Sequence, residues 1–209
     1  MNKIQKIRLF FYLKLFSNKL VKTPRGKKVF TSLWHAAWLE KKYAEKNEPI
    51  IKKYEKYDRF STDLLVNFLW FFPIGTMRII QNNEEIGLPV LNDFRIKKVW
   101  ENDTRISEVT LLTVKKRFRN TLNIPLFFLM KGLYRISKER KNEGLLVAAD
   151  KRLLFVLKRI GLPFEAIGPG VFYEGSITIP AYISFSGLEE KISRKNPWFA
   201  RFLSIKKSR

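Results

Sequence analysis

The segment from residue 144 to residue 163 constrains the fold most, because a strand pattern in it runs directly into a helix pattern. Residues 144–149 form a short apolar run that is typical of a buried strand. Asp150 suits the N-cap of a helix that ends at Gly161, with Pro163 beyond it. The apolar positions between them have helical spacing: Leu153, Leu154, Leu157 and Ile160. A buried strand followed at once by an amphipathic helix predicts a sheet covered by helices.

Patterns along the rest of the chain complete an α/β order of elements. An amphipathic helix is predicted over residues 27–45, and a second helix begins at Pro125. Strands are predicted over residues 62–70, 74–81, 105–114, 164–173 and 177–185. The resulting order predicts one mixed sheet with a βαβ crossover. With 209 residues, 45% of them apolar, the chain is large enough for a single domain with a continuous core.

Positive charge is concentrated at both ends of the chain. Lys and Arg number 41 against 19 Asp and Glu, which gives a net charge of +22. Residues 1–39 hold nine basic groups and residues 191–209 hold seven, and neither segment contains an acid. The central part therefore carries an ordinary charge for a folded domain. We expect a basic, aromatic N-terminal extension over residues 1–26, a folded domain over 27–188 and a basic amphipathic tail over 189–209.

Simple counts exclude or disfavour several kinds of site and location. The chain has no cysteine, which excludes disulfides and thiolate metal sites, and its single histidine, His35, cannot build a zinc site by itself. His35 lies off the apolar stripe of its predicted helix, so we interpret it as a half-exposed surface residue. No apolar run reaches the length of a membrane span, and no small-residue cleavage site follows the apolar residues 9–13. We therefore expect a cytoplasmic protein without a bound metal.

The two tails predict contact with an anionic membrane, on the inner face of the cell membrane. Residues 197–207 place apolar side chains at neighbouring helical positions beside several cations. These residues are Trp198, Phe199, Phe202 and Leu203, with Arg201, Lys206 and Lys207 as the cations. The N-terminal extension mixes aromatic and basic residues less regularly. The alternative for both tails is packing against the core of the domain.

Five short motifs follow one another along the chain: YDRFS at residues 57–61, IGTMRI at 74–79, GLPVLNDF at 87–94, SEVTLLTV at 107–114 and IGPGVFYEG at 167–175, extended to Pro180-Ala181. Together they resemble the autoinducer-synthase-like and long-chain N-acyl amino acid synthase branch of the GNAT acyltransferases. The resemblance covers roughly residues 29–185. It implies a GNAT fold and direct transfer of a long-chain acyl group from a phosphopantetheine thioester to a small amine, without a permanently bound cofactor.

The resemblance assigns three residues to the acceptor site. Arg78 would brace the acceptor pocket or bind a carboxylate with its planar guanidinium group. Glu108 would accept a proton from the attacking amine, which must be neutral to react. Asp58 would hold that amine or pair with Arg78. The alternatives are an ordinary strand ion pair for Arg78, a solvated strand position for Glu108 and a surface ion pair for Asp58.

The implied donor site follows the strand over residues 110–114. Its backbone amides would bind the thioester oxygen, with Thr110, Leu112 and Val114 along the pantetheine arm. Acetyl-CoA enzymes of this fold carry a glycine-rich turn after this strand, whereas residues 115–120 here read Lys-Lys-Arg-Phe-Arg-Asn. Lys116 and Arg117 would suit the acidic surface of acyl carrier protein instead. Acyl-CoA is the alternative donor, and a solvated charge run is the alternative for the cluster.

Two further considerations bound the function. After Glu108 the chain continues Val109-Thr110, where homoserine-lactone synthases continue Ser-Arg, so an amino acid or similar amine is a better acceptor than one leading to a homoserine lactone. A non-catalytic basic protein bound to nucleic acid or membrane is the competing class. A nucleic-acid binder would spread cations over its folded surface, whereas these lie in tails rich in Phe and Trp. We therefore expect no nucleic-acid partner.

Overall fold

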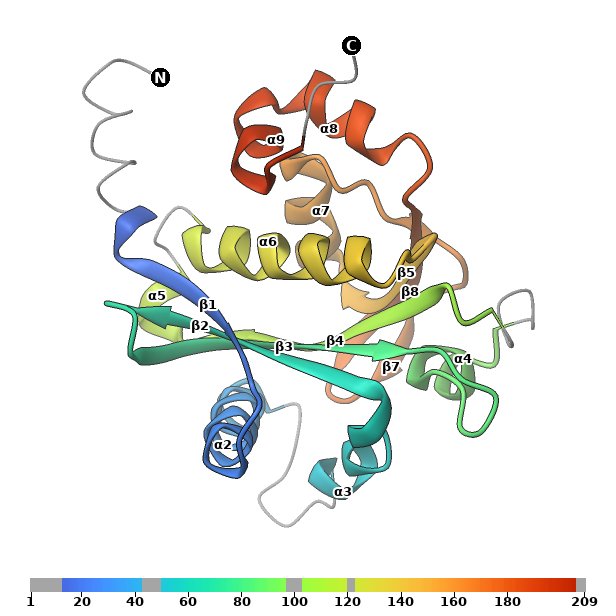
Figure 1. The fold of residues 1–209 in the computed structure, drawn as a ribbon. Coiled ribbons are helices and arrows are strands. Elements are labelled where there is room, and N and C mark those ends of the chain that lie inside the picture. The colour runs from blue at the N-terminus through green and yellow to red at the C-terminus, as the bar shows by residue number, and fades with distance from the viewer. Residues whose placement is uncertain (1–12, 43–49, 97–102, 120–122, 206–209) are drawn as a thin grey trace.

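The computed structural model describes residues 13–42, 50–96, 103–119 and 123–205. One eight-stranded sheet runs through them in the order β1-β2-β3-β4-β5-β8-β6, with β7 paired to β8. The strands are β1 (Phe16–Leu20), β2 (Ser61–Phe68), β3 (Phe72–Gln81), β4 (Ile106–Val114), β5 (Gly144–Asp150), β6 (Glu165–Ala166), β7 (Val171–Tyr173) and β8 (Ser176–Ser184). The mixed α/β sheet predicted from the sequence is confirmed (Figure 1).

Helices cover both faces of this sheet and divide the core into two layers (Figure 1). The helices are α2 (Pro24–Glu40), α3 (Ile50–Glu55), the short 3-10 helix η1 (Asp58–Phe60), α4 (Pro89–Phe94), α5 (Lys116–Arg119), α6 (Ile124–Glu139), α7 (Lys151–Ile160), α8 (Leu188–Lys195) and α9 (Pro197–Leu203). Side chains of α6, α7, α8 and α9 form the core on one face, and those of α2, α3 and α4 form it on the other. None of the helices in the described part of the chain combines the length and apolarity needed to cross a bilayer.

The βα unit at residues 144–163 is confirmed in detail. Asp150 Oδ1 accepts the backbone N–H of Leu153 at 2.7 Å and caps α7. Gly161 ends the helix with φ at +105°, a left-handed conformation that glycine adopts without a steric cost. Strand β5 lies parallel to β4, whereas the other paired strands in the sheet are antiparallel. The connection between these two parallel strands runs through α6 and is the βαβ crossover that the order of elements predicts.

The sequence-based boundaries need three corrections. Helix α2 begins at Pro24 rather than residue 27, because Thr23 Oγ1 accepts the N–H of Gly26 at 3.1 Å and caps the helix there. The helix ends at Glu40, with Lys41 as its C-cap, instead of residue 45, because Lys42 has φ at +58° and leaves the helical conformation. The strand predicted over 164–173 is two short strands, β6 and β7, because Pro169 lacks a backbone N–H and interrupts the pairing with β8.

The predicted N-terminal extension contains an edge strand of the sheet. Strand β1 pairs with β2, and Phe16 is buried against Phe68 and Phe128, with ring centroids 5.4 and 6.1 Å away. Lys19 points outward and is exposed, as is common on an edge strand. The domain therefore begins before residue 27 in this structure. Residues 1–12, which hold further apolar and basic residues of that extension, lie outside the described part of the chain.

The apolar face of the predicted C-terminal tail helix is covered by the domain itself. Phe199 of α9 is fully buried, and its ring lies 5.5 Å from that of Phe127 on α6. Trp198 and Phe202 stack with ring centroids 5.6 Å apart and also contact α6. The alternative of packing against the core therefore holds for these side chains. Lys206 and Lys207 lie outside the described residues.

Candidate active site

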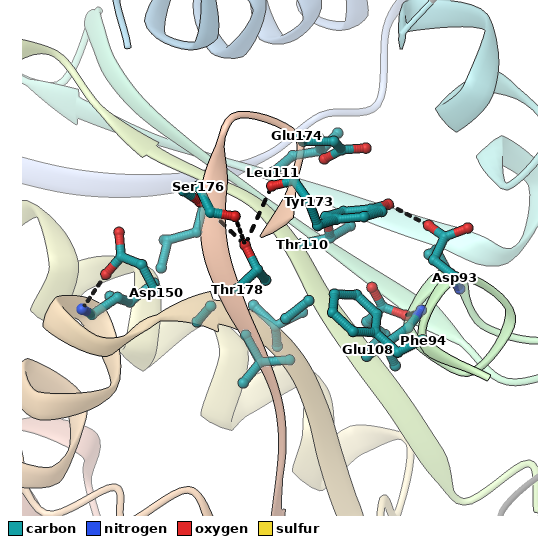
Figure 2. Close-up of a pocket in the computed structure, with 18 of the residues that line it drawn as sticks. Asp93, Phe94, Glu108, Thr110, Leu111, Asp150, Tyr173, Glu174, Ser176 and Thr178 are labelled. Carbon is teal, nitrogen blue, oxygen red and sulfur yellow. Dashed lines mark hydrogen bonds between the residues drawn. The ribbon is translucent and has the colours of Figure 1, made fainter. Parts of the chain in front are cut away.

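The parallel strands β4 and β5 separate and leave a cavity between them. Within the described residues they pair from Ile106–Gly144 to Val109–Val147, and no farther. A cavity of about 120 Å³ opens at this point, between the later residues of β4 and β5, helix α4 and the β7–β8 turn (Figure 2). The backbone of β4 beyond Val109 thus faces the cavity along the edge that β5 has left. Such an edge offers N–H groups to a bound carbonyl.

A bulge in β4 creates this separation. Leu111 has φ at +50°, and the register between β3 and β4 shifts opposite it. Thr76 Oγ1 holds the bulge by donating to the Leu111 carbonyl at 2.8 Å. Side chains along a strand alternate between the two faces of the sheet, and the extra residue in β4 reverses this alternation. Val109 and Leu112 therefore both pack on the face covered by α6, although they are three positions apart. The bulge bends β4 away from β5 and aims Thr110 at the cavity (Figure 2).

Glu108 lies at the inner end of the cavity and is 2% exposed. Its Oε2 accepts the backbone N–H of Val90 at 2.7 Å, which ties β4 to the start of α4. Burial raises the pKa of Glu108 to about 8; the Val90 hydrogen bond opposes this, and the negative charges of Asp93 and Glu174 add to it. A carboxyl group with this pKa near neutral pH can accept or donate a proton.

A cluster around Lys53 includes three residues of the cavity lining, Asp93, Tyr173 and Glu174. Lys53 Nζ lies 2.8 Å from Glu174 Oε1 and 3.0 Å from Asp93 Oδ2. The hydroxyl of Tyr173 donates to Asp93 (Figure 2). Burial alone would lower the pKa of Lys53, but its bonds to Glu174 and Asp93 raise it. Burial raises the pKa of Glu174 and of Tyr173. Four carboxyl groups line the cavity, those of Asp93, Glu108, Asp150 and Glu174, against one lysine, Lys41, and this excess favours a cationic guest.

Arg78 and Asp58, the other two predicted acceptor residues, lie outside this cavity. Arg78 is 2% exposed and binds Asp63 on the facing strand through two bonds of 2.7 and 3.0 Å, and its Nη2 lies 2.9 Å from Asp58. The predicted Asp58–Arg78 pair is therefore present. Arg78 also donates to the Tyr54 carbonyl at 2.8 Å. Because Tyr54 lines the cavity, Arg78 braces the cavity wall from behind instead of touching a guest.

The predicted donor residues divide between two neighbouring cavities. Thr110 and Leu112 line the first, whereas Val114 lines a second, of about 250 Å³, between β4, α6 and α7. Trp38, Leu112 and Leu153 line both, so the two spaces adjoin. The second cavity is walled mainly by apolar side chains, among them Phe118, Leu126 and Val156. The polar cavity thus continues towards an apolar one.

Lys116 and Arg117 lie farther out, on the turn after β4. Both are exposed, and Arg117 stacks over the Phe118 ring at 4.8 Å. Two amides of this turn already have partners: Lys115 N–H donates to the Ile74 carbonyl at 2.8 Å, and Phe118 N–H donates to the Lys115 carbonyl at 2.8 Å. Arg119 donates to the Val114 carbonyl at 2.7 Å. The amides of Lys115 and Phe118 are therefore not open to a pyrophosphate.

The elements around the cavity match those of known acyltransferase structures. The N-acyl amino acid synthase FeeM, from uncultured soil microbes, is 14% identical and superposes with a TM-score of 0.66 over 84% of this chain and 93% of FeeM. The AHL synthase LasI is 15% identical, with a TM-score of 0.63 over 81% of this chain and 89% of LasI. A GNAT-family acetyltransferase from Staphylococcus aureus Mu50 is 14% identical, with a TM-score of 0.54 over 80% and 99%.

The chain has the GNAT fold. The fold implied by the sequence motifs is therefore confirmed. No protein-family model matches the sequence, and no curated protein sequence does. At these identities the shared GNAT fold does not carry over residue roles, so the roles must come from the geometry of this chain.

Sequence patterns in this GNAT domain missed Lys53 and four residues of the cavity wall, Tyr54, Asp93, Tyr173 and Glu174. Lys53 and Tyr54 come from α3, a helix of six residues. It lies in a stretch rich in charged residues, where no helical spacing of apolar residues can be recognised. Asp93 comes from α4, also of six residues. Tyr173 and Glu174 lay within a recognised motif, where Glu174 and Gly175 both have positive φ. The Glu-Gly pair is typical of a hairpin turn, and this signal places Tyr173 and Glu174 at a tight turn between two strands.

Proposed function

We propose that this protein is an N-acyltransferase that moves a long-chain acyl group from a phosphopantetheine thioester to the amine of an amino acid or similar small acceptor. The observation that carries the proposal is Glu108, a buried carboxyl group with a pKa near 8 at the point where β4 and β5 separate. A base is needed there because the acceptor arrives as an ammonium ion and reacts as a neutral amine.

The reaction takes place between the two cavities. The carboxylate of Glu108 accepts a proton from the ammonium group, and the amine nitrogen attacks the thioester carbonyl. Backbone N–H groups of β4 beyond Val109 stabilise the oxyanion of the tetrahedral intermediate. The C–S bond then breaks as the amide forms, the departing thiolate takes the second proton from the nitrogen, and Glu108 releases the first proton to solvent. The acyl chain occupies the apolar cavity beside Leu112 and Val114.

The acceptor cavity supports a zwitterionic amine. The carboxyl groups of Glu108, Asp93 and Glu174 attract its ammonium group. Lys41 lines the same cavity and supplies a cation for the acceptor carboxylate. An amino acid carries both charges and fits this arrangement better than a simple alkylamine.

The proposed donor is an acyl carrier protein, with acyl-CoA as the alternative. The support is the turn after β4, where the amides of Lys115 and Phe118 are already bonded and Lys116 and Arg117 are exposed. A carrier protein presents an acidic surface and no free pyrophosphate, so it suits cations more than open amides. We also propose a cytoplasmic, peripheral location, in which the basic tails supply charge towards an anionic membrane.

The test is a product search with matched variants. Purified protein is incubated with long-chain acyl carrier protein or acyl-CoA and pooled amino acids, and N-acyl products are measured by mass spectrometry. Glu108→Gln should lower turnover by roughly 10²- to 10⁴-fold, because the variant cannot accept the proton. Glu143→Gln is the control, since Glu143 is an exposed residue just before β5 with an ordinary ion pair to Arg105. Absence of any N-acyl product with either donor would favour the non-catalytic class.

A further inference from the structure

The hairpin that joins β2 and β3 presents three exposed aromatic side chains at one end of the sheet. Trp70 and Phe71 are each 67% exposed, and Phe72 is 50% exposed. The rings of Phe71 and Phe72 lie 4.3 Å apart, so they form one patch. We call these three residues the aromatic tip. Contiguous exposed aromatic side chains usually mark an interaction site, because water contact with them is unfavourable.

The backbone holds the aromatic tip out from the domain. Leu69 and Trp70 have φ at +49° and +66°, a left-handed conformation that favours glycine or asparagine. Below the tip, Leu69 N–H donates to the Leu15 carbonyl at 2.6 Å, and the Phe68 ring packs 5.3 Å from that of Phe118. The base of the turn is therefore anchored to β1 and α5, and the strained turn projects its rings away from the core.

Cations surround the base of the aromatic tip. A groove of about 690 Å³ next to Pro73 is lined by four cations, which are Arg25, Lys28, Lys115 and Lys116. Glu40 is the one acid among the groove's lining residues, and Arg119 neutralises it at 3.1 Å. Figure 1 shows α5 at the same end of the sheet as the turn between β2 and β3. This end of the molecule thus combines exposed rings with positive charge.

We propose that this end of the molecule docks on an anionic lipid bilayer, with the aromatic tip inserted among the headgroups and Arg25, Lys28 and Lys115 facing the lipid phosphates. Trp and Phe side chains partition into the membrane interface, and nearby Lys and Arg add attraction to anionic lipid. A convex tip enters a soft interface without needing a matching pocket, whereas a folded protein partner would have to supply one. The docking surface differs from the predicted tail surface, whose aromatic side chains pack against α6.

Vesicle co-sedimentation of the full chain tests this inference without any substrate, so its outcome is independent of the proposed chemistry. The probe is vesicles of phosphatidylcholine mixed with phosphatidylglycerol, compared with phosphatidylcholine alone. The tip variant is Trp70→Asn with Phe71→Ser, since asparagine tolerates the left-handed turn. Phe155→Ser on α7 is the matched control, because Phe155 is 60% exposed on another part of the surface.

The tip variant should bind anionic vesicles about tenfold more weakly or worse, and Phe155→Ser should bind like the wild type. Arg25→Glu with Lys28→Glu should also weaken binding about tenfold, whereas Lys158→Glu with Lys191→Glu, on α7 and α8, should have a much smaller effect. Circular dichroism melting confirms that each variant is folded. Unchanged vesicle binding by the folded tip variant overturns the proposal. If the tip variant binds vesicles like the wild type but uses acyl carrier protein less well, the proposal is also overturned, and the aromatic tip is instead a docking site for acyl carrier protein.

Discussion

Glu108 and Arg78 are equally buried, at 2% exposure each, and both lie on central strands of the sheet. Arg78 forms ion pairs with Asp63 and Asp58, so its charge is neutralised and the residue stabilises the fold. Glu108 has one backbone N–H partner and a cavity in front of it. Burial of a charge without an opposite charge in direct contact shifts its pKa and leaves it able to exchange protons. The difference between the two roles lies in their neighbours, which a sequence pattern does not display.

The raised pKa of Glu108 also predicts a pH-dependent cost to stability. The folded state holds the Glu108 proton up to about pH 8, whereas the unfolded chain releases it near pH 4.5. Between these values the folded state binds more protons, so the free energy of unfolding should fall as pH rises through this window. Glu108→Gln removes the titration and keeps an acceptor for Val90. Urea unfolding should show the variant more stable than the wild type at pH 9, by a few kcal/mol, and nearly equal at pH 4.5. An equal difference at both pH values would contradict the buried, protonated carboxyl.

At the scale of elements, long periodic segments were predictable and short ones were not. Strand β5 and helix α7 were predicted because apolar spacing, an N-cap and a terminal glycine agree over residues 144–161. Strand β1 was missed because basic residues surround it in the sequence, and only pairing with β2 shows it is a strand. Helices α3 and α4 are too short to show a period, yet they supply Tyr54 and Asp93 to the cavity lining. The sequence therefore predicted the central strand that carries Glu108 but not the wall that faces it.

Helix α9 gives a test of whether the C-terminal residues belong to the domain. Phe199 is fully buried against α6, and Arg201 on the same helix is exposed. Phe199→Ala should lower the free energy of unfolding by about 3–5 kcal/mol, because it leaves a cavity in the core. Arg201→Ala is the control and should change it by less than about 0.5 kcal/mol. Similar urea midpoints for the Phe199 variant and the wild type would show that the helix is loosely attached.

The whole molecule separates an acidic cavity from a basic exterior. Asp93, Glu108 and Glu174 lie together in the cavity, although the chain carries a net charge of +22. This separation lets the same protein draw an ammonium acceptor inward and an anionic donor or surface to its outside. The composition shows the excess of positive charge, but only the fold shows where the acidic and the basic side chains lie.

The choice of donor should follow this exterior charge. If acyl carrier protein docks on the turn after β4, Lys116→Glu with Arg117→Glu should raise its KM about tenfold or more and leave that of acyl-CoA nearly unchanged. Use of the carrier protein should also weaken steeply as salt rises. Steady-state kinetics with both donors at several salt concentrations measure this. Equal use of acyl-CoA, with no response to salt or to the charge reversal, would rule out the carrier protein as preferred donor.

The central claim is that Glu108 takes the proton from the attacking amine, and the pH dependence of the chemical step tests it most directly. Single-turnover acyl transfer should be measured from pH 6 to 10 for the wild type and for Glu108→Gln, with the amine that gives product. The wild-type rate should rise with pH through about 8 as Glu108 loses its proton. The variant should be slower and should lack this rise, following only the higher pKa of the free amine. A variant with the same profile and rate as the wild type would contradict the account.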